Sequence, residues 1–304
     1  MGMSKRILVT MATGLTLGLT LIGSASEQRS SQYDVMDESE VTRTLVFAAG
    51  GGRTLDVRNI SGFIRVEGTT DAAVQMRIKK VIRAETRDDL AEAQRDVRLD
   101  FAENAPRVGA TVTERNGHVC GEKWNDGDFD RDRPRPHYNV RFDFTIRVPR
   151  DASLRLCTVN GGDVIVNGTR GDFDVDNVNG LIEMRQVTGS GQAHTVNGPV
   201  TVTFTANPAK TSSFKTVNGN VDVSFLEGLA ADFAMKTMNG GLFTDFEAQT
   251  LASRAATAGE RRNGKFVYRG NEFTRVRVGN GGPEITFETL NGNVRARRAG
   301  GSVR

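Results

Sequence analysis

A four-residue word close to Thr-Val-Asn-Gly recurs through the second half of the chain, and this repeat constrains the fold more than any other feature. The copies are TVNG (158–161), NVNG (177–180), TVNG (195–198), TVNG (216–219), TMNG (237–240) and TLNG (289–292), with a degenerate copy, NISG (59–62), that has Ser61 in place of asparagine. Successive asparagines lie 19, 18, 21, 21 and 52 residues apart. A catalytic motif is normally needed once, whereas a structural unit recurs as often as the structure repeats. The repeat therefore predicts a periodic architecture.

The residue before each asparagine is apolar, and an alternating segment follows each glycine. Val221 and Val223, which follow Gly219, are typical of that segment. Alternation with a period of two indicates strands that bury one face. We therefore expect the apolar column before the asparagines to point inward; it comprises Ile60, Val159, Val178, Val196, Val217, Met238 and Leu290.

Each Asn-Gly pair is predicted to form a tight turn, because both residues tolerate positive φ. A meander of hairpins would show turn signals about every 8–12 residues. The word instead returns about every 20 residues, with looser turns such as 226–228 between copies, and this favours a β-solenoid in which each pair is the same corner of a coil. Stacked asparagines would then form a hydrogen-bonded ladder. The predicted turn ladder comprises Asn160, Gly161, Asn179, Gly180, Asn197, Gly198, Asn218, Gly219, Asn239, Gly240, Asn291 and Gly292.

The composition agrees with a mainly all-β fold with coils of about 18–21 residues, since glycine (34) is abundant and aromatic residues make up only 7% of the chain. One short helix is predicted near 84–97, which is rich in strong helix formers. The flanking segments 73–82 and 138–149 alternate like strands. Residues 241–284 interrupt the repeat as a helix or a long loop, and the last copy (284–298) is expected to close the stack.

The N-terminus has the three parts of a secretory signal peptide. Lys5 and Arg6 precede the apolar run 7–23, and small residues continue to Ala25, where cleavage is expected. An uncleaved anchor is the alternative, but the run is short for a membrane span and contains threonine and glycine. No other segment is long and apolar enough to cross a bilayer. The expected organisation is a signal peptide (1–25), a flexible lead-in (26–45), a solenoid domain (46–298) with insertions at about 84–97 and 241–284, and a tail (299–304).

Export would place the two cysteines, Cys120 and Cys157, in a compartment where disulfides persist. They lie 37 residues apart, and a bridge closing that loop would add about 4 kcal/mol of stability. A disulfide and two separate buried thiols both remain open, because the sequence does not show whether the Cβ atoms approach.

Several segments together resemble the bacterial "putative adhesin" family of β-strand-repeat proteins, whose biochemical function is unknown. The resemblance spans about residues 45–298 and is carried by LDVRNISGFIRVEG (55–68), FTIRVPRDASLRLCTVNGG (144–162), the TVNG series and ITFETLNGNVRARR (285–298). It implies an exported, right-handed parallel β-helix. The family supplies no catalytic residues to carry over.

The segment 117–138 has the residues most suggestive of a metal site, but the pattern is incomplete. Asp126, Asp128, Asp130 and Asp132 alternate as in a calcium loop, yet Arg131 stands where glycine is needed and His137 where glutamate belongs. His118, Cys120 and His137 could bind zinc, although no paired ligand spacing supports this. A solvated, charge-balanced loop is favoured, so no metal or cofactor is predicted.

The remaining polar residues point to binding rather than catalysis. Outer-face carboxylates (Asp172, Asp174, Asp176 and Glu183) could perform acid–base chemistry in a groove, but polar residues are expected on any solvated strand face. His194 is interpreted as a surface residue, and no catalytic residue is assigned. The net charge of +3 does not require nucleic acid.

The sequence thus predicts a non-enzymatic, exported β-solenoid in the periplasm or at the cell surface. Its partner is unknown, and a cell-surface glycan or an envelope protein would suit such a scaffold. The alternatives are a carbohydrate-active lyase or hydrolase on a β-helix, and an accessory protein of envelope stress or signalling. A groove of clustered carboxylates with a basic partner would favour the enzyme, whereas scattered outer charges would favour the scaffold.

Overall fold

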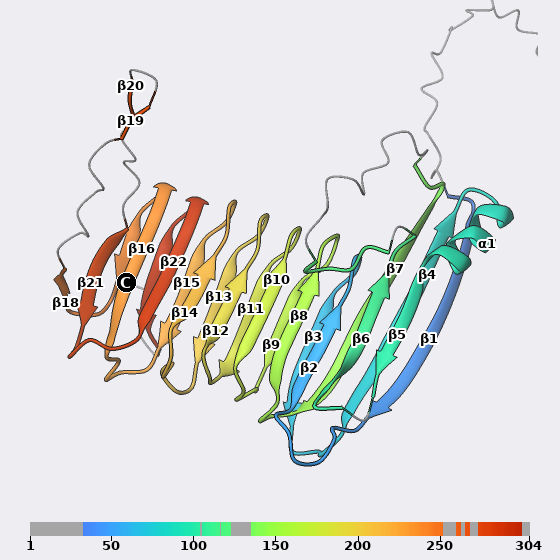
Figure 1. Ribbon diagram of the computed structural model, residues 1–304, viewed down its shortest axis with the longest axis horizontal. Coiled ribbons are helices and arrows are strands. Elements are labelled where there is room, and N and C mark those ends of the chain that lie inside the picture. Colours follow the sequence, from blue (N-terminus) through green and yellow to red (C-terminus); the bar gives the residue numbers. More distant parts are fainter. Residues whose placement is uncertain are drawn as a thin grey trace, which may run out of the picture. The chain divides into compact units, whose positions relative to one another are not determined.

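The computed structural model describes residues 33–103, 105–115, 117–122, 135–251, 260–262, 265–267 and 273–299. Within these ranges the protein is mainly β, as predicted, with one helix, two large mixed sheets and a separate two-stranded sheet (Figure 1). The expected signal peptide (1–25) and the aspartates at 126–132 lie outside the described residues, as does the tail from residue 300 onward. In the described part of the chain, no helix has the length and apolar character that a membrane crossing requires.

Within each large sheet, the strands follow one another in space in an order that differs from their order in the sequence. From edge to edge, the ten-stranded sheet contains β1 (Val35–Leu45), β4 (Val74–Ala84), β7 (Tyr138–Pro149), β3 (Ile64–Thr69), β9 (Val164–Asn167), β11 (Ile182–Val187), β13 (Val200–Phe204), β15 (Val221–Phe225), β23 (Val294–Arg298) and β17 (Leu242–Thr244). The eleven-stranded sheet contains β18 (Ala248–Thr250), β21 (Thr274–Val278), β16 (Ala231–Asn239), β22 (Glu284–Asn291), β14 (Ser212–Lys215), β12 (Gly191–His194), β10 (Phe173–Asn177), β8 (Ser153–Thr158), β2 (Thr54–Arg58), β6 (Arg107–Thr113) and β5 (Arg98–Ala102). The small sheet contains β19 (Glu260–Arg262) and β20 (Lys265–Val267).

In the repeat region, successive strands alternate between the two large sheets, and neighbours within each sheet are parallel. Each TVNG word joins a strand of the eleven-stranded sheet to one of the ten-stranded sheet, as 216–219 joins β14 to β15. The register stacks equivalent residues, so Val202 lies opposite Val223. Both valines are fully buried, as is the ring pair Phe204 and Phe225, whose centroids are 5.4 Å apart. Burial of these stacked apolar side chains is the main stabilising term.

The last copy of the repeat does not close the stack, contrary to expectation. Its strand β22 lies between β14 and β16 (Figure 1). Its strand β23 lies between β15 and β17. The chain leaves β17, returns through β21 as an antiparallel neighbour of β16, and then enters on the other edge of β16 as β22. Because β21 occupies the outer edge of β16, the inner edge is the one left to pair with the final copy.

Antiparallel strands occupy both ends of the eleven-stranded sheet and one end of the ten-stranded sheet, whose other end is β17, a parallel neighbour of β23. The predicted lead-in over 26–45 is wrong from Val35 onward, because β1 pairs with β4 along its whole length. At the opposite end, the described part of 241–284 contains the strands β17 to β21 and no helix, which corrects the expected helix or loop. Non-repeating strands of this kind cover edges that a parallel stack would otherwise expose.

The predicted helix near 84–97 is confirmed as α1 (Arg87–Asp96), and it contacts β4, β7 and β1. Thr86 is its N-cap: the Thr86 side chain accepts a hydrogen bond from the backbone nitrogen of Asp89 at 3.1 Å. The Asp89 carboxylate accepts in return from the backbone nitrogen of Thr86 at 3.0 Å. This reciprocal capping explains why the helix begins where it does.

Most of the apolar column before the asparagines does not point into the core, so the prediction is wrong for all of its members except those at the start of the repeat, where Ile60 belongs to the core and Val159 packs against it. Ile60 is buried, and Val159 and Val178 are half-buried. The exposed fractions of the other members are 38% for Val196, 37% for Val217, 64% for Met238 and 40% for Leu290. The residue one position earlier, a threonine or an asparagine, is buried in every copy except the terminal one at 237–240. Since side chains alternate, a shift of one position exchanges inside and outside.

The threonine at this earlier position donates a hydrogen bond to a glycine carbonyl of the neighbouring copy. The oxygen–oxygen distances are 2.9 Å (Thr158 to Gly62), 2.9 Å (Thr195 to Gly180), 2.8 Å (Thr216 to Gly198), 2.9 Å (Thr289 to Gly219) and 2.8 Å (Thr237 to Gly292). In copy 177–180, Asn177 Nδ2 donates to the Gly162 carbonyl at 3.0 Å instead. A buried carbonyl without a donor is costly, so the position requires threonine or asparagine.

The glycines of the word allow neighbouring corners to approach, and most do not provide the positive φ that was expected. Gly180, Gly198 and Gly219 have no positive φ. A Cβ on Gly219 would overlap the carbonyl oxygen of Gly198. In copy 158–161 this role belongs to Gly162, and Gly161 is an additional residue with a φ of 64°. The predicted turn ladder is therefore corrected at Gly161.

Thr216→Val is expected to lower the free energy of unfolding by about 1–2 kcal/mol, because it removes the donor to the half-buried Gly198 carbonyl with little change of shape. The neighbouring change Val217→Thr is expected to stay within about 0.5 kcal/mol, because Val217 is exposed. Urea unfolding of both variants measures the difference. Equal losses would contradict the assignment of inside and outside at the corner.

Gly219→Ala is expected to cost at least about 2 kcal/mol, because its new methyl group meets backbone atoms of Gly198 that have no space to move. Gly52→Ala is the matched control, since no heavy atom lies within 4 Å of a Cβ built there. Thermal unfolding of the two variants separates them. If both melt like the native chain, the close approach of the corners is not what requires glycine.

Candidate functional site

The asparagines of the repeat form a ladder of side-chain hydrogen bonds, each from Nδ2 to the Oδ1 of the next asparagine. The distances are 3.1 Å (Asn179 to Asn160), 2.8 Å (Asn197 to Asn179), 2.8 Å (Asn218 to Asn197), 2.7 Å (Asn291 to Asn218) and 2.7 Å (Asn239 to Asn291). All the bonds run in one direction, so the amide nitrogen of Asn160 has no acceptor among the described residues. Ser61 lies opposite Asn160, at the position where another asparagine would continue the ladder.

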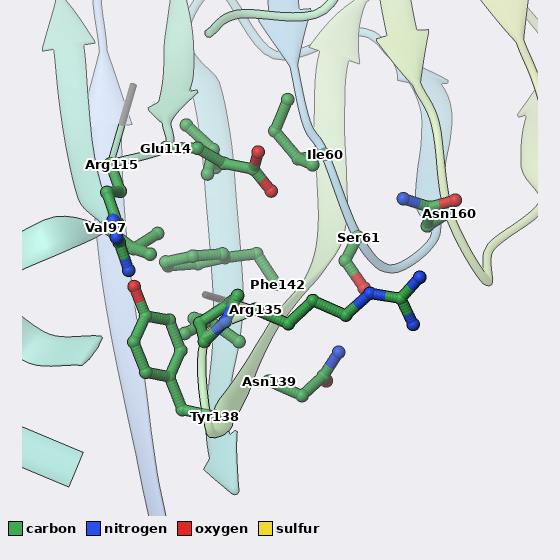
Figure 2. A pocket seen from close by; sticks show the side chains of 13 residues that line it. Ile60, Ser61, Val97, Glu114, Arg115, Arg135, Tyr138, Asn139, Phe142 and Asn160 are labelled. Atoms are coloured by element: carbon green, nitrogen blue, oxygen red, sulfur yellow. The ribbon is translucent and has the colours of Figure 1, made fainter. Parts of the chain in front are cut away.

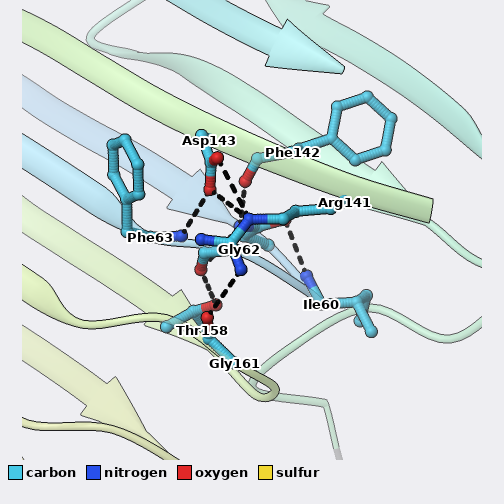
Figure 3. A network of polar contacts seen from close by, with 9 residues as sticks. Ile60, Gly62, Phe63, Arg141, Phe142, Asp143, Thr158 and Gly161 are labelled. Atoms are coloured by element: carbon cyan, nitrogen blue, oxygen red, sulfur yellow. Dashed lines mark hydrogen bonds and ion pairs between the residues drawn. The ribbon is translucent and has the colours of Figure 1, made fainter. Parts of the chain in front are cut away.

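Buried hydrogen bonds hold the corner that contains Ser61 (Figure 3). The fully buried Asn59 donates from Nδ2 to the carbonyl oxygens of Gly62 at 3.2 Å and Phe142 at 2.8 Å. Its Oδ1 accepts from the backbone nitrogen of Ile60 at 2.9 Å. These bonds fix the backbone on both sides of Ser61, because each partner is itself part of the sheet or the corner.

Arg141 links this corner to the next one, as Figure 3 shows. Its Nε donates to Asp143 Oδ1 at 2.8 Å, and its Nη1 donates to the carbonyl oxygen of Gly161 at 3.0 Å. The same Asp143 oxygen accepts from the backbone nitrogen of Phe63 at 3.1 Å. The two corners that flank the end of the ladder are therefore held in a defined arrangement.

A cavity of about 470 Å³ lies beside Ser61, and we call it the ladder-head pocket (Figure 2). Its polar lining includes Ser61, Glu114, Arg135, Asn139 and Asn160. Figure 2 shows the Arg135 side chain extending past Ser61, and the Asn160 amide with its nitrogen turned toward Ser61 and its oxygen turned away. The orientation of that amide agrees with the direction of the ladder.

The charges around the ladder-head pocket are only partly paired. Arg115 lies 3.4 Å from Glu92 and 3.8 Å from Asp96. The Tyr138 hydroxyl donates to Asp96 at 2.9 Å, and burial together with this hydrogen bond raises the pKa of Tyr138. Arg135 forms no hydrogen bond or ion pair within the described part of the chain. Its guanidinium therefore has no ionic partner within contact distance among the described residues.

A second cavity, of about 540 Å³, adjoins the first and shares Ile60, Glu114 and Asn160 with it; we call it the disulfide pocket. The structure joins Cys120 and Cys157 by a disulfide, with their Cα atoms 5.7 Å apart, so that the segment 117–122 forms one wall. The first four members of the apolar column, Ile60, Val159, Val178 and Val196, also line the pocket, and we call them its floor.

Burial shifts three ionisable groups of the disulfide pocket, Asp176, Glu114 and His194, toward their neutral forms. Burial raises the pKa of Asp176 to about 6, with a further contribution from Asp174 and an opposing one from Arg155. Burial also raises the pKa of Glu114, although His118 opposes this effect. The pKa of His194 is lowered by burial and by Lys215. The pocket thus combines apolar side chains with ionisable side chains from β10, β12 and the segment 117–122.

The four outer carboxylates expected from the sequence do not converge. Asp174 and Asp176 lie on β10 and Asp172 directly precedes it, but Glu183 lies on β11 in the other sheet. Asp172 pairs with Lys210 at 2.8 Å, and Glu183 pairs with Arg185 at 2.6 Å. Only Asp176 lines the disulfide pocket. His194, interpreted as a surface residue, lines it too, 3.9 Å from Asp176.

The three residues considered for zinc are not assembled into a site. His118 and Cys120 line the disulfide pocket, but the Cys120 sulfur belongs to the disulfide. His137 is paired with Glu85 at 2.9 Å. Throughout the described ranges, no group of three or more His, Cys, Asp or Glu residues could hold a metal ion.

Sequence reasoning missed Glu114 and Arg135 as pocket residues, because they come from segments outside the repeat. Ser61 carried a signal, since it stands where every later copy has asparagine. The space left by that shorter side chain could be recognised only after Asn160 was placed opposite it.

No model of a protein family matches the chain, and no curated protein sequence matches it either. Among solved structures, a "putative cell adhesion protein" from Clostridium sporogenes aligns with 86% of this chain and 100% of its own, at 11% identity and a TM-score of 0.39. A "putative adhesin" from Bacteroides fragilis aligns with 86% of this chain and 97% of its own, at 11% identity and a TM-score of 0.36. Likenesses this low do not transfer a function.

Asp176→Asn is expected to stabilise the protein at pH 7 and to leave its stability unchanged at pH 3.5. The folded state binds the Asp176 proton more tightly, with a pKa of about 6 against 3.8 for a free aspartate. The associated stability is complete below pH 3.8 and is lost as the pH rises through 6. The gain at pH 7 is about 1 kcal/mol after allowance for solvent screening of this half-exposed side chain.

Urea unfolding at both pH values measures this effect, with Asp174→Asn as the matched control. Asp174 accepts a hydrogen bond from Gln192 at 2.7 Å and lies 3.7 Å from Arg155, and losing these contacts is expected to offset the relief of its repulsion with Asp176. A similar gain in both variants would show that general charge reduction, and not burial of Asp176, is responsible.

Proposed function

We propose that the protein is an exported, non-enzymatic binding scaffold, built as a right-handed parallel β-helix, whose two adjoining corner pockets receive the ligand. The single observation that carries this proposal is the outward-facing apolar column. Its first four members floor the disulfide pocket, and Val217, Leu290 and Met238 continue it as an exposed stripe. A contiguous exposed apolar surface with polar borders is typical of an interaction site.

The β-helix is supported by the alternation of successive strands between two sheets with parallel neighbours. The amide ladder adds support, because its bonds require the same corner to recur in register in every copy. Such a stack is rigid, and a rigid surface binds without a large cost in ordering.

Export is supported by the signal-like N-terminus, in which Lys5 and Arg6 precede the apolar run 7–23 and the small residues before Ala25. The disulfide between Cys120 and Cys157 agrees with an oxidising compartment, either the periplasm or the cell surface. We expect the partner to be a cell-surface glycan or an envelope protein.

A carbohydrate-active enzyme is a second candidate because of one observation. The pKa of Asp176 is raised to about 6 in a pocket that also contains His194, and a general acid needs a pKa near the working pH. Against this, the neighbouring Asp174 is engaged by Arg155 and Gln192, so the paired carboxylate that such enzymes use is already occupied.

Binding of the mature chain to an array of bacterial and host surface glycans, and to purified envelope proteins, tests the proposal. Val196→Glu is expected to weaken the strongest interaction at least about tenfold, because it places a carboxylate on the apolar floor of the disulfide pocket. Val46→Glu is the matched control, because Val46 is similarly exposed but lines neither pocket. Circular dichroism establishes that both variants are folded.

The same binding experiment also distinguishes a non-enzymatic scaffold from an enzyme. A bound glycan is expected to keep its chain length after prolonged incubation. Shortening of the glycan that disappears in Asp176→Asn would make the protein an enzyme. Absence of any interaction, or equal weakening by Val196→Glu and Val46→Glu, would contradict the corner pockets as the binding site.

A further inference from the structure

The amide ladder ends at an unused hydrogen-bond donor. Every amide nitrogen from Asn179 onward donates toward Asn160, so the Asn160 nitrogen is the end of the series and has no described acceptor. Hydrogen bonds in a chain polarise one another, which strengthens the donor at this end. An acceptor oxygen placed opposite it would continue the ladder by one more bond.

The structure leaves space for that oxygen. Ser61 pairs with Asn160 across the two corners, but the serine side chain is shorter than that of asparagine and has no amide oxygen to accept the bond. The ladder-head pocket, of about 470 Å³, lies at this position. The buried bonds of Asn59 hold the Ser61 corner in place, so the space is not closed by relaxation of the backbone.

Further donors surround the same space. The Arg135 guanidinium extends past Ser61, and the Asn139 amide and the Ser61 hydroxyl also line the pocket (Figure 2). Arg115, the other guanidinium of the lining, is held by Glu92 and Asp96. Arg135, which has no ionic partner within contact distance among the described residues, is therefore the guanidinium that a ligand can reach. A guanidinium presents two parallel donors that match the two oxygens of a carboxylate.

The opposite wall limits the charge of the ligand. Glu114 lines the pocket, so a dianion such as phosphate would be repelled more strongly than a monoanion. A single negative charge on two oxygens fits one free guanidinium together with the amide of Asn160.

We infer that the ladder-head pocket binds a carboxylate group. The Arg135 guanidinium donates hydrogen bonds to this carboxylate, and one carboxylate oxygen accepts a hydrogen bond from the side-chain amide of Asn160. That oxygen takes the place of the amide oxygen that one more asparagine in the ladder would supply. This inference rests on the proposed binding function and names the ligand chemistry of one of its two pockets. The carboxylate comes from an acidic sugar or from a peptide C-terminus, and the two sources place the same group in the pocket.

The test uses two pairs of probes, each comprising a carboxylate and a neutral counterpart. D-Glucuronate is compared with D-glucose, and N-acetyl-L-alanine with N-acetyl-L-alaninamide, by titration followed through the side-chain amide signals in NMR. At least one carboxylate is expected to bind and shift the signal of Asn160, whereas its neutral counterpart does not. The pair that responds identifies the source. If neither carboxylate binds at concentrations up to tens of millimolar, the inference is overturned.

Two variants locate the site. Arg135→Gln is expected to weaken carboxylate binding at least about tenfold. Arg147→Gln removes the same charge from a residue outside the pocket, 3.6 Å from Asp71, and is expected to have no effect. Equal weakening by the two would show that only the net charge attracts the probe, and would overturn the inference.

Ser61→Asn is the sharper variant, because it keeps every charge and adds the absent amide. It is expected to accept the Asn160 hydrogen bond itself, to retain or raise the melting temperature, and to abolish carboxylate binding. Unchanged carboxylate binding in a folded Ser61→Asn protein would overturn the inference.

Failure of this inference is distinguishable from failure of the proposed function. Glycan or envelope-protein binding that is sensitive to Val196→Glu, with no response to either carboxylate probe, would overturn the carboxylate site alone. The opposite result is a carboxylate response that Arg135→Gln removes, without any binding of a glycan or an envelope protein. That result would overturn the scaffold proposal and support the carboxylate site.

Discussion

The close approach of neighbouring corners is the constraint on which the rest of the structure depends. A glycine in each copy lets the next backbone come into contact, and a buried threonine or asparagine satisfies the carbonyl that this contact would otherwise leave without a donor. The two requirements act together, because the approach that excludes a Cβ also excludes water from the carbonyl. The Thr and Gly positions of the TVNG word are explained by this contact.

The same contact determines what the corner presents to the outside. With threonine pointing inward, alternation turns the following apolar residue outward, and the asparagine next to it joins the ladder. One row of buried side chains, the threonine or asparagine that begins each copy, therefore has three consequences. These are the exposed apolar stripe, the floor of the disulfide pocket and the unused donor of Asn160. The candidate site lies where this regular pattern is interrupted by Ser61 and covered by segment 117–122, which is held by the disulfide between Cys120 and Cys157.

The ends of the sheets follow a different principle from the repeat. A parallel stack leaves edges with unpaired backbone groups. In this protein antiparallel strands cover both edges of the parallel part of the eleven-stranded sheet, and one edge of the parallel part of the ten-stranded sheet. The return of the chain through β21 also explains why the final copy enters between two earlier ones and does not follow them. Sequence order and spatial order differ because strand pairing depends on which edge is available, and not on which copy is synthesised last.

The sequence by itself determined the repeat, the mainly-β class, the short helix at Arg87–Asp96 and the asparagines that form the ladder, because these depend on local periodicity and on residue type. Only the tertiary structure decided that Val217 points outward and Thr216 inward. The opposite assignment fits the same alternation of apolar and polar residues, because the two assignments differ only by a shift of one position at the corner. The tertiary structure alone also brought Glu114 and Arg135 to the end of the ladder. Those residues belong to no periodic pattern, and pockets form from segments that meet only after the chain has folded.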